Sequence, residues 1–128
     1  MKMLVVAAAL LAAVPVTPAA AMDVAAYLAK AEILRQQGMM AMFSGEYKQL
    51  QAETLADARA LKQERLAAQR AGRRPAYCPA DKASLVPEEI FAAMNAVPPA
   101  RRAQTPVKDA LRAAFARKYP CGGAARGR

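Results

Sequence analysis

The first 21 residues have the layout of a secretory signal peptide, and this feature constrains the fold most because it decides which residues fold and in which compartment. Lys2 provides a positive start, residues 4–14 form an apolar segment, and two prolines precede the small residues Ala19-Ala20-Ala21. We expect cleavage before Met22, which leaves residues 22–128 to fold in the periplasm. The apolar run is shorter than the roughly 20 residues that a bilayer span needs, so an uncleaved anchor is the less favoured alternative.

The chain contains two cysteines, Cys78 and Cys121. Thiols that reach an oxidising compartment form disulfides, and two cysteines allow only one intramolecular pairing. In the chain-entropy model, closing this loop stabilises the fold by about 4 kcal/mol. A redox-active pair or a zinc site is less favoured, because the cysteines lack CxxC spacing and the chain has no histidine. We therefore predict a structural disulfide.

The first half of the remaining chain predicts two helices. Asp23 is a good N-cap, Gly38 is a good C-terminal end, and the apolar residues between them recur at helical spacing: Val24, Tyr27, Leu28, Ala31 and Leu34. Ser44 is the expected N-cap of a second helix over residues 45–71, which ends at Gly72. Its apolar stripe should contain Leu50, Thr54, Leu61 and Ala68, with Leu55 and Leu66 on an adjoining stripe.

The second half predicts two more helices after a loop over residues 72–81. A third helix starts near Pro87 and stops at Val97-Pro98-Pro99, and we expect Ile90, Phe91 and Met94 to face inward. A fourth starts after Thr105-Pro106, with the Thr105 hydroxyl as its cap, and ends at Pro120. Its inner face is predicted to hold Val107, Leu111, Phe115 and Tyr119.

No segment alternates with period two over a useful length, so strands are not expected. The predicted fold is all-α: a small bundle of about four helices, stapled by one disulfide, after a cleaved signal peptide. The helical domain spans residues 22–121, with no transmembrane segment. Residues 122–128 should form a disordered basic tail.

No arrangement of residues typical of a catalytic site stands out in this sequence. The absence of histidine removes the commonest general base and the commonest metal ligand. Glu88 and Glu89 with Asp81 offer carboxylates, but adjacent glutamates in a first helical turn are more simply explained by the helix dipole. Glu53 and Asp57 lie four residues apart on a helix face expected to be exposed. We predict that the chain is not an enzyme and needs no cofactor.

Met39, Met40, Met42 and Phe43 form an apolar cluster between the first two predicted helices. Thioethers are soft ligands, which suggests copper(I), although the net charge of +9 repels cations. Clustered methionines also serve as flexible filler where helices meet. A third interpretation is an exposed apolar turn that docks a partner.

Arginine pairs at Arg73-Arg74 and Arg101-Arg102 contribute to a sequence pI of about 10.1. Outside the cytoplasm, the acidic partners available to such residues are anionic lipids, cell-wall polymers or an acidic protein, and nucleic acid is not expected. The simpler interpretation is that these arginines are solvated loop residues.

The second half also resembles a known family. Tyr77-Cys78-Pro79 in a loop, a helix around Ile90–Met94, a helix over Val107–Phe115, and Tyr119-Pro120-Cys121 are similar to the C-terminal part of Tai/Rap-type immunity proteins. Those are small exported helical proteins that bind and neutralise cell-wall amidases delivered by type VI secretion. The likeness covers residues 77–121. The whole chain after the signal peptide also resembles uncharacterised small exported proteins of Gram-negative bacteria.

Together these features predict a non-catalytic protein that binds another protein in the cell envelope. The resemblance implies an immunity-type inhibitor of a cell-wall-degrading effector. The alternative is a general envelope structural or stress factor that contacts anionic lipid or cell wall through its basic surface. The residues we expect to contact a partner are Met39, Met40, Met42, Phe43, Arg73, Arg74, Arg101 and Arg102.

Overall fold

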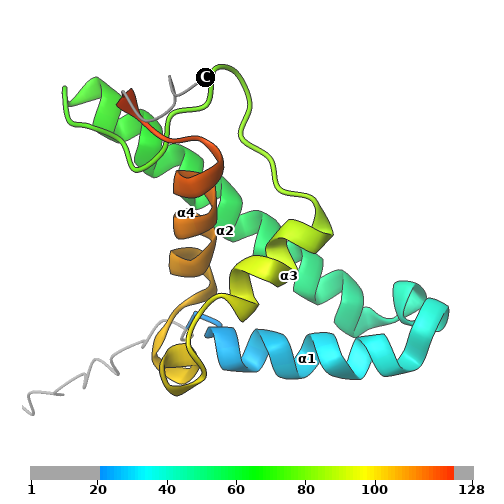
Figure 1. Ribbon diagram of the computed structural model, residues 1–128. Coiled ribbons are helices and arrows are strands. Elements are labelled where there is room, and N and C mark those ends of the chain that lie inside the picture. The colour runs from blue at the N-terminus through cyan, green and yellow to red at the C-terminus, as the bar shows by residue number, and fades with distance from the viewer. Residues whose placement is uncertain (1–20, 123–128) are drawn as a thin grey trace, which may run out of the picture.

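The computed structural model describes residues 21–122 (Figure 1). Within that range the fold is all-α and has no strands: four α-helices and two short 3₁₀ helices. The predicted fold class is therefore confirmed. The predicted signal peptide, apart from Ala21, and the predicted basic tail, apart from Gly122, lie outside the described residues.

The elements follow in the order α1 (Val24–Gln37), η1 (Gly38–Phe43), α2 (Gly45–Arg70), α3 (Pro87–Asn95), η2 (Pro99–Gln104) and α4 (Val107–Lys118). In Figure 1, α1, α2 and α4 outline a triangle, and α3 lies across its opening. The corner between α1 and α2 is η1, whereas α2 and α4 pack against each other along the C-terminal half of α2. This arrangement places α3 across the middle of the triangle, against α1 and α4.

Local capping sets the boundaries of α1 and α2, as predicted. The Asp23 carboxylate accepts a hydrogen bond from the Ala26 amide at 2.8 Å, and the Ser44 hydroxyl accepts one from the Tyr47 amide at 3.1 Å. Gly38 has φ of +63°, a backbone conformation that residues with a Cβ rarely adopt, so α1 ends there.

The start of α4 differs from the prediction. The Thr105 hydroxyl donates to the Arg101 carbonyl at 2.7 Å, so it does not cap the helix; Pro106 occupies the N-cap position. The backbone bonds elsewhere instead, because the Val24 amide donates to the Thr105 carbonyl at 2.8 Å and the Val107 amide donates to the Met22 carbonyl at 3.0 Å. This short antiparallel bridge joins the beginnings of α1 and α4 and forms one corner of the triangle.

The core lies where α4 meets α2, α3 and the loop after α2. Five of the twelve residues of α4 are buried: Val107, Ala110, Leu111, Ala114 and Phe115. The Phe115 ring stacks on Tyr77 with 4.9 Å between ring centroids, and the Arg65 guanidinium lies 5.5 Å from the centroid of the Tyr77 ring. Tyr77, which the helical patterns could not place, is one of the largest fully buried side chains.

The predicted disulfide is present between Cys78 and Cys121, with 4.9 Å between the two Cα atoms. The Cys78 amide donates to the Tyr119 carbonyl at 2.7 Å, and the Arg74 guanidinium donates to the Cys121 carbonyl at 2.9 Å. The loop after α2 is therefore tied to the end of α4 by both covalent and hydrogen bonds.

Two predicted inward residues are instead exposed. Phe91 is 44% exposed because α3 buries the row of Ile90, Ala93 and Met94, and Phe91 lies one step round the helix from it. Leu55 is 50% exposed because α3 packs on α1 and α4 rather than on α2, which leaves the side of α2 that holds Leu55 open.

Candidate functional site

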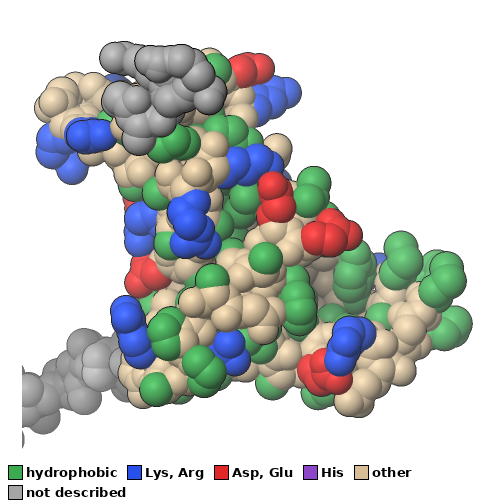
Figure 2. Space-filling view, viewed as in Figure 1, with side chains coloured by type: hydrophobic (Ala, Val, Ile, Leu, Met, Phe, Trp, Pro, Cys, Tyr) green, Lys and Arg blue, Asp and Glu red, His purple; other side chains and the backbone are tan. Residues whose placement is uncertain are grey.

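The most exposed apolar surface of the described chain is η1. We call Met39, Met40, Met42 and Phe43 the η1 patch; their side chains are 83%, 73%, 56% and 77% exposed. Hydrophobic side chains form a separate cluster at this end of the molecule in Figure 2. The interpretation of these methionines as filler between helices is therefore wrong, because no helix within residues 21–122 packs over them. An apolar cluster that remains exposed is a feature of binding surfaces.

The backbone beneath the η1 patch is held in place. Ala41 is buried, and its carbonyl accepts hydrogen bonds from both the Ser44 amide at 2.9 Å and the Ser44 hydroxyl at 2.7 Å. Ser44 also caps α2, so one residue ends η1 and begins the next helix. The four large side chains are presented on a defined backbone.

For the copper hypothesis, the structure adds no supporting ligand group. Between residues 21 and 122 no three His, Cys, Asp or Glu side chains come close enough together to hold a metal ion. Both cysteines are committed to the disulfide. The copper hypothesis remains one for the methionine sulfurs alone.

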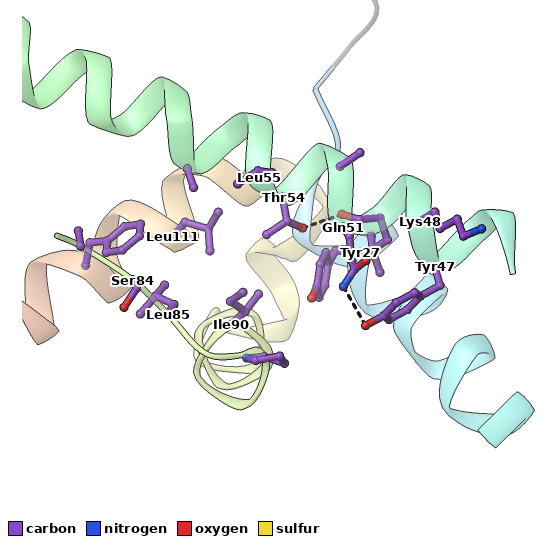
Figure 3. A pocket seen from close by; sticks show the side chains of 16 residues that line it. Tyr27, Tyr47, Lys48, Gln51, Thr54, Leu55, Ser84, Leu85, Ile90 and Leu111 are labelled. Carbon is purple, nitrogen blue, oxygen red and sulfur yellow. Dashed lines mark hydrogen bonds between the residues drawn. The ribbon is translucent and has the colours of Figure 1, made fainter. Parts of the chain in front are cut away.

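A second candidate site is an apolar groove of about 700 Å³ in the middle of the triangle (Figure 3). All four α-helices and the loop before α3 contribute to it. Its lining residues are Tyr27, Tyr47, Lys48, Leu50, Gln51, Ala52, Thr54, Leu55, Ala58, Ala83, Ser84, Leu85, Pro87, Ile90, Leu111 and Phe115. Ligand sites in proteins have volumes of about 300–1,000 Å³ and a mostly apolar lining, so the groove has the size and composition of a binding site.

The groove has a polar end and an apolar end. Figure 3 shows Tyr27, Tyr47, Lys48 and Gln51 at one end and Leu85 and Leu111 at the other. The Gln51 side-chain amide donates to the Tyr47 hydroxyl at 2.8 Å. Burial raises the pKa of Tyr27, and the neighbouring Tyr47 raises it further, so the Tyr27 phenol is a neutral donor at physiological pH.

The loop wall of the groove is pinned to the end of α4. The Ser84 amide donates to the Tyr119 hydroxyl at 3.1 Å, and the Ser84 carbonyl accepts from that hydroxyl at 3.2 Å and from the Lys118 ammonium at 3.0 Å. Because Tyr119 is also bonded to Cys78 through its carbonyl, the disulfide end of α4 positions this wall.

The two arginine pairs are not brought together. Arg101-Arg102 lie in η2, before α4, whereas Arg73-Arg74 lie beside the residues that follow α4, and the 12-residue helix between them is roughly 18 Å long. Two of the four are used within the fold: Arg74 binds the Cys121 carbonyl, and Arg102 donates to the Val97 and Asn95 carbonyls at 2.9 and 3.1 Å, which caps the end of α3. Arg73 and Arg101 are exposed.

Glu89, one of the carboxylates considered in the sequence, serves the fold. Glu89 accepts from the Val86 amide at 2.9 Å and the Lys118 ammonium at 2.8 Å, and these bonds lower its pKa, with Lys118 the larger cause. The Glu53 and Asp57 face was expected to be exposed, but both residues are half-buried, and burial raises the pKa of Asp57. The expectation failed because residues 21 and 22 lie near this face of α2.

Sequence reasoning missed the groove altogether. The signals that point to it are two tyrosines, Tyr27 and Tyr47, and a leucine, Leu55, which stands beside the main apolar stripe of α2. None of these indicates a groove until the lengths and crossing positions of the helices are known.

Comparison with protein-family models, curated proteins and solved structures finds no significant match to this chain. None of the helices over residues 21–122 combines the length and the apolar character needed to cross a membrane. The function is therefore inferred from the η1 patch and the groove alone.

Proposed function

We propose that this chain is an exported, non-catalytic protein that works by binding another protein in the cell envelope, and that the η1 patch is the contact surface. The observation that carries the proposal is the exposure of four large apolar side chains on consecutive turns of a hydrogen-bonded corner. Leaving that surface in water forfeits the stabilisation that burial would bring, roughly 1.5–3 kcal/mol for each fully buried large side chain. A partner that covers the patch recovers this stabilisation.

Polar surroundings make this patch suited to reversible contact. In α1, Glu32 and Arg35 form an exposed ion pair at 2.9 Å just before η1, and Lys48 and Gln49 follow it in α2. Apolar anchors within a polar rim are typical of protein–protein interfaces. The basic character of the chain favours an acidic partner, because complementary charge speeds encounter.

The specific form that we propose is an immunity-type inhibitor of a cell-wall-degrading effector. Its support is the resemblance of residues 77–121 to Tai/Rap-type immunity proteins. Those residues contain the disulfide, α3 and α4, whereas the η1 patch lies outside them. In this proposal the shared part acts as the scaffold, and the corner between α1 and α2 supplies the contact.

The alternative, an envelope factor that binds anionic lipid or cell wall through arginines, has weaker support. It needs a shared basic surface, but the arginine pairs lie at opposite ends of α4 and two of the four side chains hold the fold together.

The proposal is tested with the oxidised chain lacking residues 1–21 and a type VI-delivered cell-wall amidase, assayed for release of peptide from purified cell wall. We expect stoichiometric inhibition by the native chain. Met39→Ser with Phe43→Ser should weaken it at least tenfold, since two interface anchors each worth about 1–2 kcal/mol are lost.

The matched control replaces two other exposed apolar residues, Ile33 and Phe91, with serine. These variants should inhibit as well as the native chain. Equal loss in both double variants would contradict a specific role for the η1 patch. Absence of inhibition with retained, patch-dependent binding to the amidase would reject the inhibitor function but keep the protein-binding one.

A further inference from the structure

The groove in the middle of the triangle has the chemistry of a small-molecule site, distinct from the η1 patch. The two surfaces share no residue: the η1 patch ends at Phe43, whereas the groove begins at Tyr47 on the α2 side. The groove is therefore a second candidate binding site, separate from the η1 patch.

The charge of the lining is one-sided. Among the residues that line the groove, Lys48 is the one charged side chain, and no carboxylate accompanies it. Lys48 stands at the rim of the end that also holds Tyr27 and Tyr47 (Figure 3). In Figure 3 the Lys48 ammonium points away from the two phenols, so a ligand group placed there meets the phenolic hydroxyls directly and the positive charge when the flexible Lys48 side chain turns toward it.

The hydrogen-bonding groups at this end favour an acceptor. The Tyr47 oxygen already accepts the Gln51 amide at 2.8 Å, so the Tyr47 hydrogen is free to be donated elsewhere. The Lys48 ammonium is a donor only. Carboxylates and phosphates, which are rich in acceptor oxygens and negatively charged, match this end of the groove.

The remainder of the groove is apolar and elongated. From the polar end it passes Leu55 and Ile90 and reaches Leu85 and Leu111 (Figure 3), and Phe115 also lines it. Leu111 and Phe115 are also core residues, so the floor at this end is rigid. Such a surface suits an aliphatic chain, whose transfer from water is favourable by about 0.8 kcal/mol for each buried CH₂ group.

We propose that this groove binds a single-chain anionic amphiphile: its carboxylate or phosphate head lies by Lys48, Tyr27 and Tyr47, and its aliphatic chain lies toward Leu111 and Phe115. Both kinds of head exist in the cell envelope, on free fatty acids and on lysophospholipids. The same groove chemistry accepts either, and the choice between them is made by experiment.

The test is isothermal titration of the oxidised chain lacking residues 1–21 with dodecanoate, dodecyl phosphate and 1-dodecanol, each below its micelle concentration. We expect saturable one-to-one binding of at least one anion and weaker binding of the alcohol, which has the same chain without the charge. The order of the two anions identifies the head group. Ring and methyl NMR signals of Tyr27, Tyr47, Leu111 and Phe115 should shift on binding.

Two substitutions on α2 provide a matched pair. Lys48→Gln should weaken anion binding about twofold to fivefold, the range for an exposed charge pair, whereas Lys62→Gln, the same change outside the groove, should leave it unaltered. Ala58→Trp places a large ring in the groove and should abolish binding. Because Ala58 is half-buried, Ala52→Trp, at an exposed lining position, repeats the test if the first variant does not fold.

Three results would overturn the proposal: no saturable binding of either anion, binding of dodecanol as tight as that of the anions, or equal effects of the two lysine substitutions. If no amphiphile binds and the inhibited amidase shifts the groove signals instead, the groove belongs to a protein interface. Loss of amidase inhibition with retained amphiphile binding leaves this inference intact, so the two proposals fail separately.

Discussion

Helix α4 and the corner η1 are both rich in apolar residues, yet α4 buries five residues and η1 buries one. In α4 the apolar residues recur every three or four positions, so they share a face that two helices and a loop can cover. In η1 they are nearly consecutive, in the order Gly-Met-Met-Ala-Met-Phe. A helical turn spreads such a run around its axis, and no single neighbour can cover all of it.

The two regions also differ in their ion pairs. Lys108 and Arg112 of α4 bind Glu64 of α2 at 2.7 and 2.9 Å, and Lys118 binds Glu89 of α3 at 2.8 Å. No ion pair involves a residue of η1 among those that the structure describes. We conclude that the buried and charged residues of α4 hold the helices together, whereas the residues of η1 form an exposed apolar surface. Substitutions in the two regions should therefore have different effects.

The largest expected effect comes from truncating the same residue type in the two regions. Phe115→Ala should lower the free energy of unfolding by about 3–5 kcal/mol, because it removes a buried ring stacked on Tyr77. Phe43→Ala should change it by less than about 0.5 kcal/mol, because that ring is exposed. Urea unfolding followed by circular dichroism measures both, and a similar loss in the two variants would refute the comparison.

The second-largest effect is expected from removing the disulfide. Replacing Cys78 and Cys121 by serine should lower the free energy of unfolding by about 2–4 kcal/mol, since the unfolded chain regains the freedom of a closed loop. The variant should also bind amphiphiles less tightly, because the disulfide end of α4 positions the groove wall at Ser84. The native chain with added reductant is the control. Unchanged stability in both would show that the hydrogen bonds of this loop suffice.

The hydroxyls of Ser44 and Thr105, which lie before α2 and α4, should contribute differently to stability. Ser44→Ala removes the cap of α2 and the bond to Ala41, so it should cost about 1 kcal/mol. Thr105→Ala removes a bond to Arg101 but no helix cap, and its effect on the same unfolding curve should be smaller. The reverse order would mean that α4 depends on Thr105 after all.

The smallest effect is a dependence on pH. Hydrogen bonds from Lys108, then from Arg112, hold the pKa of Glu64 below its ordinary value of 4.5. The folded state therefore favours the ionised carboxylate, so this contribution is present above pH 4.5 and is lost as the pH falls through the lowered pKa.

Because Glu64 is 44% exposed, the contribution should be modest. Glu64→Gln removes it, so the difference in unfolding free energy between the native chain and this variant should shrink as the pH falls from neutral to below the lowered pKa. Urea midpoints at several pH values measure that difference, and one that stays constant over the whole range would show that the carboxylate is not stabilised by α4.

Much of the fold could be predicted from the sequence, because it is set by neighbouring residues. Asp23 and Ser44 each accept a hydrogen bond from the amide three residues ahead, Gly38 supplies a conformation that other residues rarely adopt, and prolines bound α3. The stripes of α2 and α4 depend on helical periodicity alone. The cysteine pairing needed only the number of cysteines and an oxidising compartment.

Tertiary structure alone decided what those elements cover. Phe91, Leu55 and the η1 patch are exposed because no helix among the described residues packs over them, and the groove is open because α3 packs on α1 and α4 and not on α2. Arg102 caps the end of α3 through the Val97 and Asn95 carbonyls, a contact that the helical patterns did not indicate. Burial depends on which residues distant in sequence meet in space, so local patterns fix the helices but not the surfaces between them.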